Sequence, residues 1–555
     1  MSIKSVDKTT VFWAIVFSIL WPNTSIGQTE THLGIEHVIV IGFDGLSPDG
    51  LANATTPVFD KLMREGAFTM HARAVLPTSS STNWASMIMG AGPEQHGITS
   101  NAWERDNFIL PAITQSEDFV FPTIFHLLDS QVENAEIGAI YHWGGFGRLF
   151  EKAAVDYDVS PETEDETSVL AANYIKDKKA DLTFVHFDHV DHAGHEFGHG
   201  TPEYYESVEK ADMLLGQLVS VIEKTDLLEK TLVIISADHG GLGKGHGGES
   251  LAEIEIPFIA WGKGVKKNHK LLYPVYQYDN AATVAFALGL KTPQAWIGKP
   301  VKEAFIGFET DDEYPILEQL KPPVILPKAV GYKKAGGLFN ESTSVVIENP
   351  NSQGVVNYTL DGTMPSGDSQ SYENPVQINK NTVLKAALFK NGKINSEVAE
   401  SFFRIKPNSL KKPITYEVFY LNNLSFLPAI GNKKPDVTGK SFEITSDEVK
   451  EKIKSNTVVR FTTQIEIDQA DTYRFYVRSD DGSKLFIDGK TVVDNDGDHG
   501  VIENDGEINL KAGLHTLEVL WFNGGGDGWL DVFVETGQMP KQILPASMLK
   551  PIGNE

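Results

Sequence analysis

The stretch "HVIVIGFDG" at residues 37–45 decides the fold of the first half of this chain. It is a nearly unbroken apolar run, rich in β-branched residues, that ends in an aspartate. Two similar runs follow, "LTFVHFDHV" at 182–190 and "TLVIISADHG" at 231–240. Such runs are typical of parallel strands buried on both faces. Between the second and third runs, residues 202–224 show helical spacing of apolar side chains (Val208, Ala211, Leu215, Leu218 and Ile222). The pattern predicts an α/β domain over residues 33–310, with a mostly parallel sheet sandwiched by helices and ligand groups at the strands' carboxyl ends.

The N-terminus and the composition indicate an exported protein. Residues 1–27 combine Lys4 and Lys8 with an apolar run from Val11 to Trp21 that is too short to span a bilayer, followed by small or polar residues up to Gly27. This layout is typical of a secretory signal peptide, and an N-terminal membrane anchor is the alternative. No later apolar run is long enough to cross a membrane. We therefore expect a periplasmic or extracellular protein that has no transmembrane segment after the signal peptide is cleaved. The net charge is −27, which argues against nucleic acid as a bulk partner.

Two further domains are expected beyond a Pro- and acid-containing linker at residues 310–328. Short alternating stretches such as "VVNYTLDGTMP" predict a small β-sandwich over residues 329–406. Longer alternating stretches, such as "TYRFYVRSDDGSKLFIDGK", predict a second all-β sandwich over 412–553.

Acidic and histidine side chains gather at the predicted strand ends of the first domain. Each one alone is as well explained by a turn cap or a satisfied hydrogen-bond donor. Together they are three carboxylates and three imidazoles in a chain without cysteine, a set that suits two Zn²⁺ ions with open positions. The candidate ligands are Asp44, Asp191, His195, Asp238, His239 and His246.

The order of these motifs resembles the alkaline phosphatase superfamily, and within it the nucleotide pyrophosphatase/phosphodiesterase branch. The resemblance covers roughly residues 35–300 and includes "GPEQHGITSN", "DHAGH" and "ADHG". It implies that Asp44, Asp238 and His239 hold one zinc ion and that Asp191, His195 and His246 hold the other. The neighbouring His189, His192 and His199 are then second-shell donors or substituted ligands.

The same resemblance selects a nucleophile from the hydroxyl run in "LPTSSSTNWASMIMG" at 76–90. The family nucleophile stands two residues after a Pro-Thr pair and 21 residues before an asparagine, which points to Ser80 and Asn101. Ser80 would also be a ligand of the first zinc, and most relatives carry threonine there. Asn101 and the Ser81 N–H would stabilise the phosphoryl oxygens. For the other hydroxyls we expect capping of a helix that runs from Asn83 onward, and for His96 a structural role beside Asn101.

The expected activity is hydrolysis of phosphodiester bonds through a phosphoseryl intermediate. Diester chemistry is favoured because Arg148 is the one arginine near a candidate pocket, whereas monoesterases usually supply more cations. Trp84, His142, Trp143 and Phe146 could line that pocket, although aromatic residues are more often core. The substrate class is a small molecule or a glycan- or lipid-linked diester. The alternatives are a zinc phosphomonoesterase and a glycan-binding surface protein with an inactive hydrolase domain.

The C-terminal domains resemble known accessory modules. Residues 329–406 resemble the small sandwich that follows the catalytic domains of chitobiases and hexosaminidases, which usually acts as a spacer. Residues 412–553 resemble the protective-antigen-type sandwich that binds glycans, in which an Asp-Asp pair holds Ca²⁺. Asp480 and Asp481 occupy that place, with Asp527 as a companion, and a type I turn is the competing explanation for Asp-Asp-Gly. An extracellular or cell-surface glycan is the expected partner.

Overall fold

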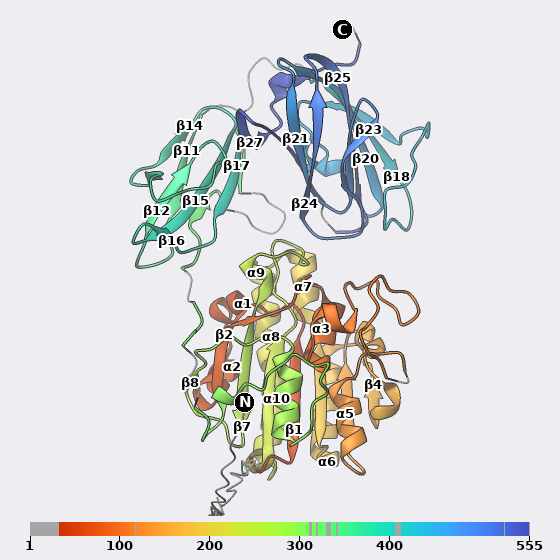
Figure 1. The fold of residues 1–555 in the computed structure, drawn as a ribbon, viewed down its shortest axis with the longest axis vertical. Helices are drawn as coiled ribbons and strands as arrows, with labels where there is room; N and C mark the ends of the chain where they lie inside the picture. Colours follow the sequence, from red (N-terminus) through yellow and green to blue (C-terminus); the bar gives the residue numbers. More distant parts are fainter. Residues whose placement is uncertain are drawn as a thin grey trace, which may run out of the picture.

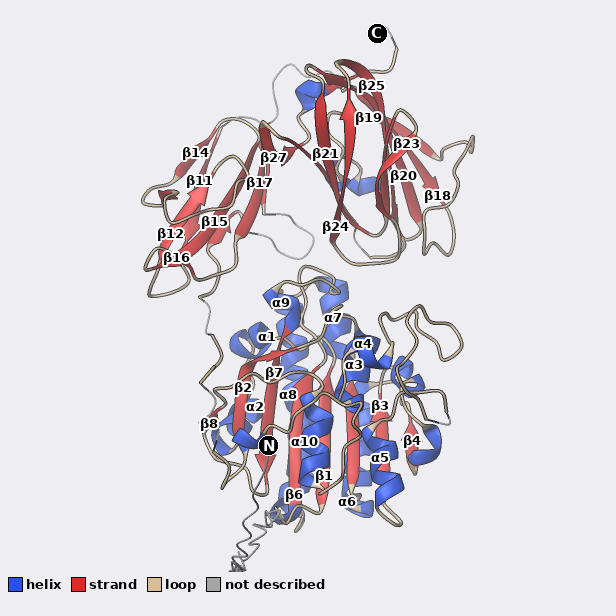
Figure 2. Ribbon diagram, viewed as in Figure 1, coloured by secondary structure: helices blue, strands red, loops and turns tan. Residues whose placement is uncertain are grey.

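The computed structural model describes residues 33–553 apart from 117, 310–312, 318–319, 329–334, 340–341, 406–411 and 527. The predicted signal peptide and Asp527 therefore lie outside the described residues. Figure 1 shows an α/β domain below a pair of β-sandwiches, and Figure 2 shows that helices are concentrated in the first of these domains. Within the described residues, no helix has the length and apolar character needed to cross a membrane.

The first domain is built on an eight-stranded sheet. The strands lie in the order β4 (Tyr157–Val159), β3 (Ile137–Tyr141), β5 (Leu182–Phe187), β1 (His37–Phe43), β6 (Thr231–Ala237), β7 (Glu255–Gly262), β2 (Ala67–Arg73) and β8 (His269–Lys270). Only β7 runs against the others. The three central strands are those predicted from the apolar runs, and nearly all their residues are buried. The predicted α/β class is confirmed.

Helices cover both faces of this sheet. On one face α3 (Ser80–Met89), α5 (Ile124–Gln131) and α10 (Asp279–Ala287) pack together. On the other face α8 (Pro202–Lys224), which has the bounds predicted from its apolar spacing, packs with α1 (Pro48–Asn53), α2 (Pro57–Glu65), α6 (Glu164–Lys178) and α7 (His189–Phe197). The short helices α4 (Pro93–His96) and α9 (Leu251–Ile254) complete the domain.

The second domain is a small sandwich of two sheets. One sheet contains β10 (Gly336–Phe339), β17 (Ala399–Ile405), β15 (Thr382–Lys390), β12 (Val355–Thr359) and β13 (Gln370–Ser371), with β16 (Lys393–Ile394) beside β15. The other contains β14 (Val376–Ile378), β11 (Thr343–Glu348) and β9 (Val324–Leu326). Strand β9 lies inside the segment predicted as linker. That expectation is wrong there, because Ile325 is buried in this sandwich's core while β9 pairs with β11.

The third domain is a larger sandwich. Its seven-stranded sheet contains β19 (Val437–Ser441), β18 (Ile414–Tyr420), β20 (Thr457–Ile467), β25 (Gly513–Asn523), β22 (Ser483–Ile487), β23 (Lys490–Asn495) and β28 (Leu549–Lys550). Its four-stranded sheet contains β24 (Ile502–Leu510), β21 (Asp471–Asp480), β26 (Trp529–Thr536) and β27 (Met539–Ile543). The loops at one end of this sandwich face α7 and the carboxyl edge of the eight-stranded sheet (Figure 1).

Candidate active site

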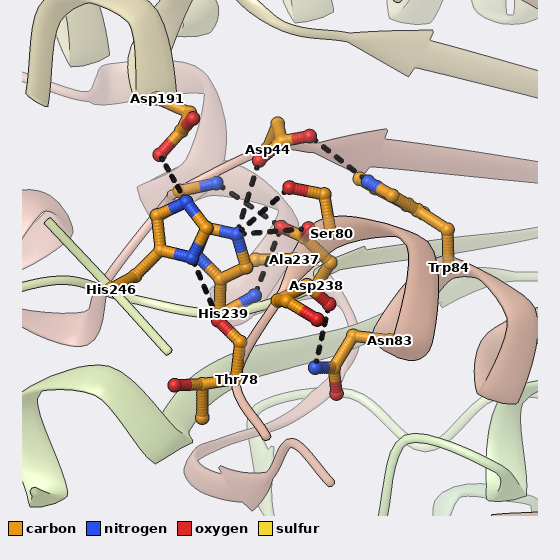
Figure 3. Close-up of polar contacts among 12 residues, drawn as sticks. Asp44, Thr78, Ser80, Asn83, Trp84, Asp191, Ala237, Asp238, His239 and His246 are labelled. Carbon is orange, nitrogen blue, oxygen red and sulfur yellow. Dashed lines mark hydrogen bonds and ion pairs between the residues drawn. The ribbon is translucent and has the colours of Figure 1, made fainter. Parts of the chain in front are cut away.

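The first cluster forms where two central strands end side by side. Asp44 follows β1 and Asp238 follows β6, and the register of these parallel strands pairs Phe43 with Ala237. His239 Nε2 lies 3.4 Å from Asp44 Oδ1 and 3.2 Å from Asp238 Oδ2 (Figure 3). Candidate ligand atoms of these three buried residues lie within 4.8 Å of one another. The structure thus brings together one of the two ligand sets predicted from sequence.

The electrostatics of this cluster suit a cation. Asp44 Oδ1 and Asp238 Oδ2 are buried, and neither accepts a hydrogen bond among the described residues. Burial, followed by the charges of Asp44 and Asp191, raises the pKa of Asp238 well above its usual range. Burial and then His246 lower the pKa of His239 to about 4, so that this imidazole is neutral and able to ligate. Positive charge placed among these groups would relieve the repulsion between the carboxylates.

The second cluster is built on a helix and a loop. Asp191 and His195 stand one turn apart on α7, with His195 Nε2 3.2 Å from Asp191 Oδ2. His246, in the loop after β6, places Nε2 3.9 Å from Asp191 Oδ1. Burial acts to raise the pKa of Asp191, but His195 and His246 outweigh it and hold that pKa well below its usual range. The compact triad here is Asp191, His239 and His246, while His195 contacts the other oxygen of Asp191.

The three predicted histidine ligands share one orientation. Each places its Nδ1 against a backbone carbonyl oxygen, which accepts a hydrogen bond from the ring when Nδ1 carries the proton. That arrangement leaves Nε2 as the ligating atom facing the carboxylates. The pairs are His239 with Gly240 at 2.8 Å, His195 with Lys244 at 2.8 Å and His246 with Thr78 at 2.7 Å.

Sequence reasoning missed two groups beside the first cluster. His186, the penultimate residue of β5, is fully buried with Nε2 3.4 Å from Asp44 Oδ2. Asp188 follows the same strand and forms a further cluster with Asp44 and His186. Burial and the charges of Asp44 and Asp191 raise the pKa of Asp188 to about 8. The sequence did contain a signal for these two residues: "HFDH" places histidine and aspartate at the end of a buried strand, as "FDG" and "ADHG" do for Asp44 and Asp238.

The three extra histidines of the Asp191 loop differ in their surroundings. His189 is buried and His199 is partly buried, and desolvation lowers their pKa values to about 4 and about 3. Their ring nitrogens make no hydrogen bond among the described residues. The His192 side chain is 74% exposed and lies 3.7 Å from Glu196. The expectation of a second-shell role is wrong for His192, because its position on α7 faces solvent.

The hydroxyl run begins a helix earlier than predicted. Helix α3 starts at Ser80 rather than Asn83, so Ser80 occupies its first position. Ser80 Oγ lies 3.3 Å from His239 Nε2, and the residue is buried (Figure 3). Ser79 is the N-cap residue but makes no side-chain cap; its hydroxyl contacts Thr82 instead. Asn83 fixes the incoming loop by donating to the carbonyl oxygens of Val75, Pro77 and Ser79.

Asn101 lies beside this helix start, with one correction. The Ser81 N–H donates to Asn101 Oδ1 at 2.8 Å. It is therefore committed to Asn101, and the expectation that it faces a phosphoryl group is wrong in this arrangement. Because Asn101 Oδ1 accepts this hydrogen bond, the side-chain NH2 group of Asn101 is the remaining candidate donor to a phosphoryl oxygen. Arg148 donates to Ser81 Oγ at 2.8 Å and to the Asn101 carbonyl at 2.5 Å, while Glu104 lies 2.9 Å from its guanidinium.

The predicted aromatic pocket is not formed as expected. Trp84 is fully buried and donates from Nε1 to Asp44 Oδ2 at 3.0 Å, so it positions a candidate ligand rather than lining a pocket (Figure 3). Phe146 is also fully buried. His142 Nε2 contacts the Glu162 carbonyl at 3.2 Å, away from the pocket described next. His96 is buried, accepts from the Ile98 N–H and contacts Ser86 Oγ, as a structural role requires.

A pocket of about 700 Å³ opens at the second cluster and is shared with the C-terminal sandwich. Asp480 and Asp481 line its far side. Asp480 is the last residue of β21, and Asp481 lies between β21 and β22, two strands that belong to different sheets. Asp481 accepts from the His499 N–H at 3.2 Å and from the Gly524 N–H at 2.7 Å. Burial and the neighbouring Asp498 raise the pKa of Asp481 to about 7.

The first domain thus combines an α/β fold with clusters of aspartate and histidine next to Ser80, the first residue of α3. Residues 38–242 match the family model described as type I phosphodiesterase / nucleotide pyrophosphatase. Residues 334–400 match the chitobiase/beta-hexosaminidase C-terminal domain, and residues 413–542 match the PA14 domain. The first domain is thus homologous to phosphodiesterases and nucleotide pyrophosphatases, which are hydrolases, and the predicted order of three modules is confirmed.

Individual relatives are similar at low identity. An uncharacterised pyrophosphatase/phosphodiesterase of Schizosaccharomyces pombe is 26% identical over 43% of this chain and 51% of its own length. A venom phosphodiesterase of Crotalus durissus collilineatus is 28% identical over 39% of this chain and 28% of its own length. The chain thus spans about half the length, or less, of these relatives. A human ectonucleotide pyrophosphatase/phosphodiesterase 5 structure aligns with 16% identity and a TM-score of 0.43, covering 49% of this chain and 100% of that one.

Proposed function

We propose that this protein is an exported two-zinc phosphodiesterase that cleaves its substrate through a phosphoseryl intermediate. The observation that carries the proposal is the position of Ser80 Oγ, 3.3 Å from His239 Nε2 at the first cluster and at the start of α3. Homology of the first domain to phosphodiesterases supports the reaction class. The signal-peptide pattern of residues 1–27 supports export.

The donor set fits zinc. Asp44, Asp238 and His239 would hold one ion together with Ser80, and Asp191, His195 and His246 would hold the other. The observation behind this fit is that buried oxygens of Asp44, Asp191 and Asp238 accept no hydrogen bond from any described residue. When bound, zinc supplies positive charge that offsets the charge developing on the phosphoryl group, and Lewis acidity toward the oxygens it contacts.

The reaction then proceeds in two steps, formation of a phosphoserine at Ser80 and its hydrolysis. Ser80 Oγ attacks phosphorus, the bond to the leaving oxygen breaks, and the serine proton leaves with the alcohol. Water then attacks the phosphoseryl group, which releases a phosphomonoester and restores the serine hydroxyl. In this proposal the Asn101 amide donates to a non-bridging oxygen, and the hydrogen bond from Arg148 to the Asn101 carbonyl supports that role.

The test is a pair of matched variants within the hydroxyl run. Ser80→Ala is expected to abolish hydrolysis of bis-p-nitrophenyl phosphate while zinc stays bound. Thr82→Ala is the control, because the Thr82 hydroxyl contacts Ser79 rather than the cluster, and it should keep most of the activity. Full turnover by Ser80→Ala would refute the nucleophile. Fewer than about 0.5 equivalents of zinc in the purified protein would refute the metal assignment.

A phosphomonoesterase is the second candidate, and Arg148 is the observation that favours it. Its guanidinium contacts Ser81 and Asn101, next to the proposed nucleophile. Glu104 offsets that charge at 2.9 Å, and a diester carries less negative charge than a monoester. We therefore expect bis-p-nitrophenyl phosphate to be preferred over p-nitrophenyl phosphate, and the reverse preference would establish the monoesterase.

For the C-terminal sandwich we propose carbohydrate binding at Asp480 and Asp481, supported by the match to the PA14 domain. The buried Asp481 carboxylate beside Asp498 has the oxygen donors that Ca²⁺ prefers. Addition of Ca²⁺ to zinc-loaded protein should raise the unfolding temperature of wild type but not of Asp481→Asn. An equal shift in both proteins would exclude calcium here.

A further inference from the structure

The pocket between the first and third domains has two chemically different sides. On the catalytic side lie the ring of His246, which also faces Asp191, and the exposed Asn101. On the other side are loops of the C-terminal sandwich. We refer to these loops as the acidic wall; they comprise Asp480, Asp481, Asp498, His499, Gly500 and Gly524. At about 700 Å³ the space is large enough for a small ligand that reaches both sides.

The acidic wall contacts the loop that carries His246. A Cβ atom placed on Gly500 would lie 2.9 Å from the carbonyl oxygen of His246, a distance that real Cβ atoms essentially never show. Glycine therefore allows the two backbones to approach this closely. The side of the pocket opposite Asn101 and His246 thus belongs to another domain.

Buried contacts hold the acidic wall in this position. Arg404 of the small sandwich lies 2.7 Å from Glu443 and 2.6 Å from Asp531 of the large one, and all three side chains are buried. Val383 and Phe402 pack against Phe533 and Ile543 across the same interface. The small sandwich also accepts a hydrogen bond on Glu397 Oε1 from the Leu251 N–H of the first domain, at 2.8 Å.

The chemistry of the wall selects the kind of group that fits. Asp481 accepts one backbone N–H on each oxygen, from His499 and from Gly524, and its side chain also hydrogen-bonds to Asp498. The exposed Asp498 offers carboxylate oxygen to the hydroxyl groups of a ligand, and the acidic wall repels a second anionic group. Next to His246 of the other side, Asp191 Oδ1 is buried and accepts no hydrogen bond among the described residues, which indicates a cationic or donor ligand there.

We propose that a single substrate occupies both sides: a phosphodiester whose phosphate binds at the clusters and whose neutral sugar or polyol arm binds at the acidic wall. This inference rests on the proposed phosphodiesterase function and names its substrate class. It also changes the role of the C-terminal sandwich, which determines substrate specificity inside the catalytic pocket instead of anchoring the enzyme to a separate glycan.

The test compares two diesters that differ in the hydroxyl groups of one arm. Zinc-loaded full-length protein, with Ca²⁺ present, is assayed with glucose 6-(p-nitrophenyl phosphate) and with cyclohexylmethyl p-nitrophenyl phosphate, which lacks the hydroxyls. Cleavage of either ester bond is followed by ³¹P NMR. We expect kcat/KM to be at least about tenfold higher for the sugar diester, because hydrogen bonds to charged groups are worth about that factor or more. A ratio below about two would overturn the proposal.

Variants of the wall locate the effect. Asp498→Asn and Asp481→Asn should each reduce the ratio of kcat/KM between the two diesters about fivefold or more. Asp468→Asn is the matched control, since Asp468 is exposed beyond the opposite end of β21. An unchanged ratio in Asp498→Asn would overturn the proposal even if Asp481→Asn failed to fold. Absence of hydrolysis of every diester, bis-p-nitrophenyl phosphate included, would instead refute the phosphodiesterase itself.

Discussion

Replacement of Trp84 by phenylalanine tests how a buried core residue supports the proposed zinc site. Trp84 is fully buried, and its Nε1–H donates to Asp44 Oδ2 at 3.0 Å. The other contact of that oxygen is the longer one to His186, at 3.4 Å. Phenylalanine keeps most of the packing against Phe146 and Phe184 but removes the donor. The variant therefore isolates one hydrogen bond to a proposed zinc ligand.

The expected magnitude follows from the charge on Asp44. A hydrogen bond to a charged group contributes about 1.5–3 kcal/mol, and loss of a group that orients a metal ligand costs about 10- to 100-fold in affinity. We therefore expect Trp84→Phe to bind zinc about 10- to 100-fold more weakly at the cluster that contains Asp44. Hydrolysis at saturating zinc should fall much less, because Trp84 does not touch the reacting atoms.

Competition with a chromophoric chelator measures the zinc affinity, and Trp296→Phe supplies the matched control. Trp296 is also buried, but its Nε1–H donates to the neutral carbonyl of Pro122 at 3.1 Å. It should lose about 0.5–1.5 kcal/mol of stability and none of its zinc affinity. If Trp84→Phe and wild type bound zinc equally within about twofold, the argument that Trp84 positions Asp44 would be wrong.

Three further predictions concern stability and metal content. Lowering the pH from about 8 to 5 should reduce the free energy of unfolding by about 2 kcal/mol through His96, because burial lowers the pKa of this residue to about 3 in the folded protein while the unfolded residue titrates near 6.5. Stability is therefore lost as the pH falls. Urea unfolding should show a smaller loss in His96→Gln. Arg404→Met should destabilise the protein by about 3–5 kcal/mol, since Glu443 and Asp531 remain as buried carboxylates; calorimetry showing no change would contradict this. Excess EDTA should abolish hydrolysis and lower the unfolding temperature, and added zinc should restore both; an unaffected rate would count against a metal enzyme.

Much of the first domain could be predicted from the sequence because its signals are local. The apolar runs that became β1, β5 and β6 bury nearly every residue, and α8 has the bounds given by its apolar spacing. Strand-end residues such as Asp44 and Asp238 then meet because adjacent parallel strands end at the same edge. The role of each residue in the clusters remains a prediction.

Other features depend on packing between distant segments, and sequence patterns do not carry them. Trp84 gave a pocket signal by composition, yet it lies beneath Asp44 because α3 packs its indole against Gly42 of β1. The Ser81 N–H is committed to an asparagine 20 positions along the chain, which no local pattern indicates. Strand β9 was hidden in a Pro-rich segment because its partner β11 lies beyond it.

By itself, the sequence determined the α/β class, the order of the three modules and the groups available for metal binding. Each of these follows from residue type and short-range periodicity, which act along the chain. Only the tertiary structure decided that His186 and Asp188 join the clusters, and that Asp480 and Asp481 line a pocket together with residues of the first domain. The physical reason is that these relations depend on how sheets and domains pack, through contacts such as those of Arg404 and Gly500 that join residues far apart in the chain.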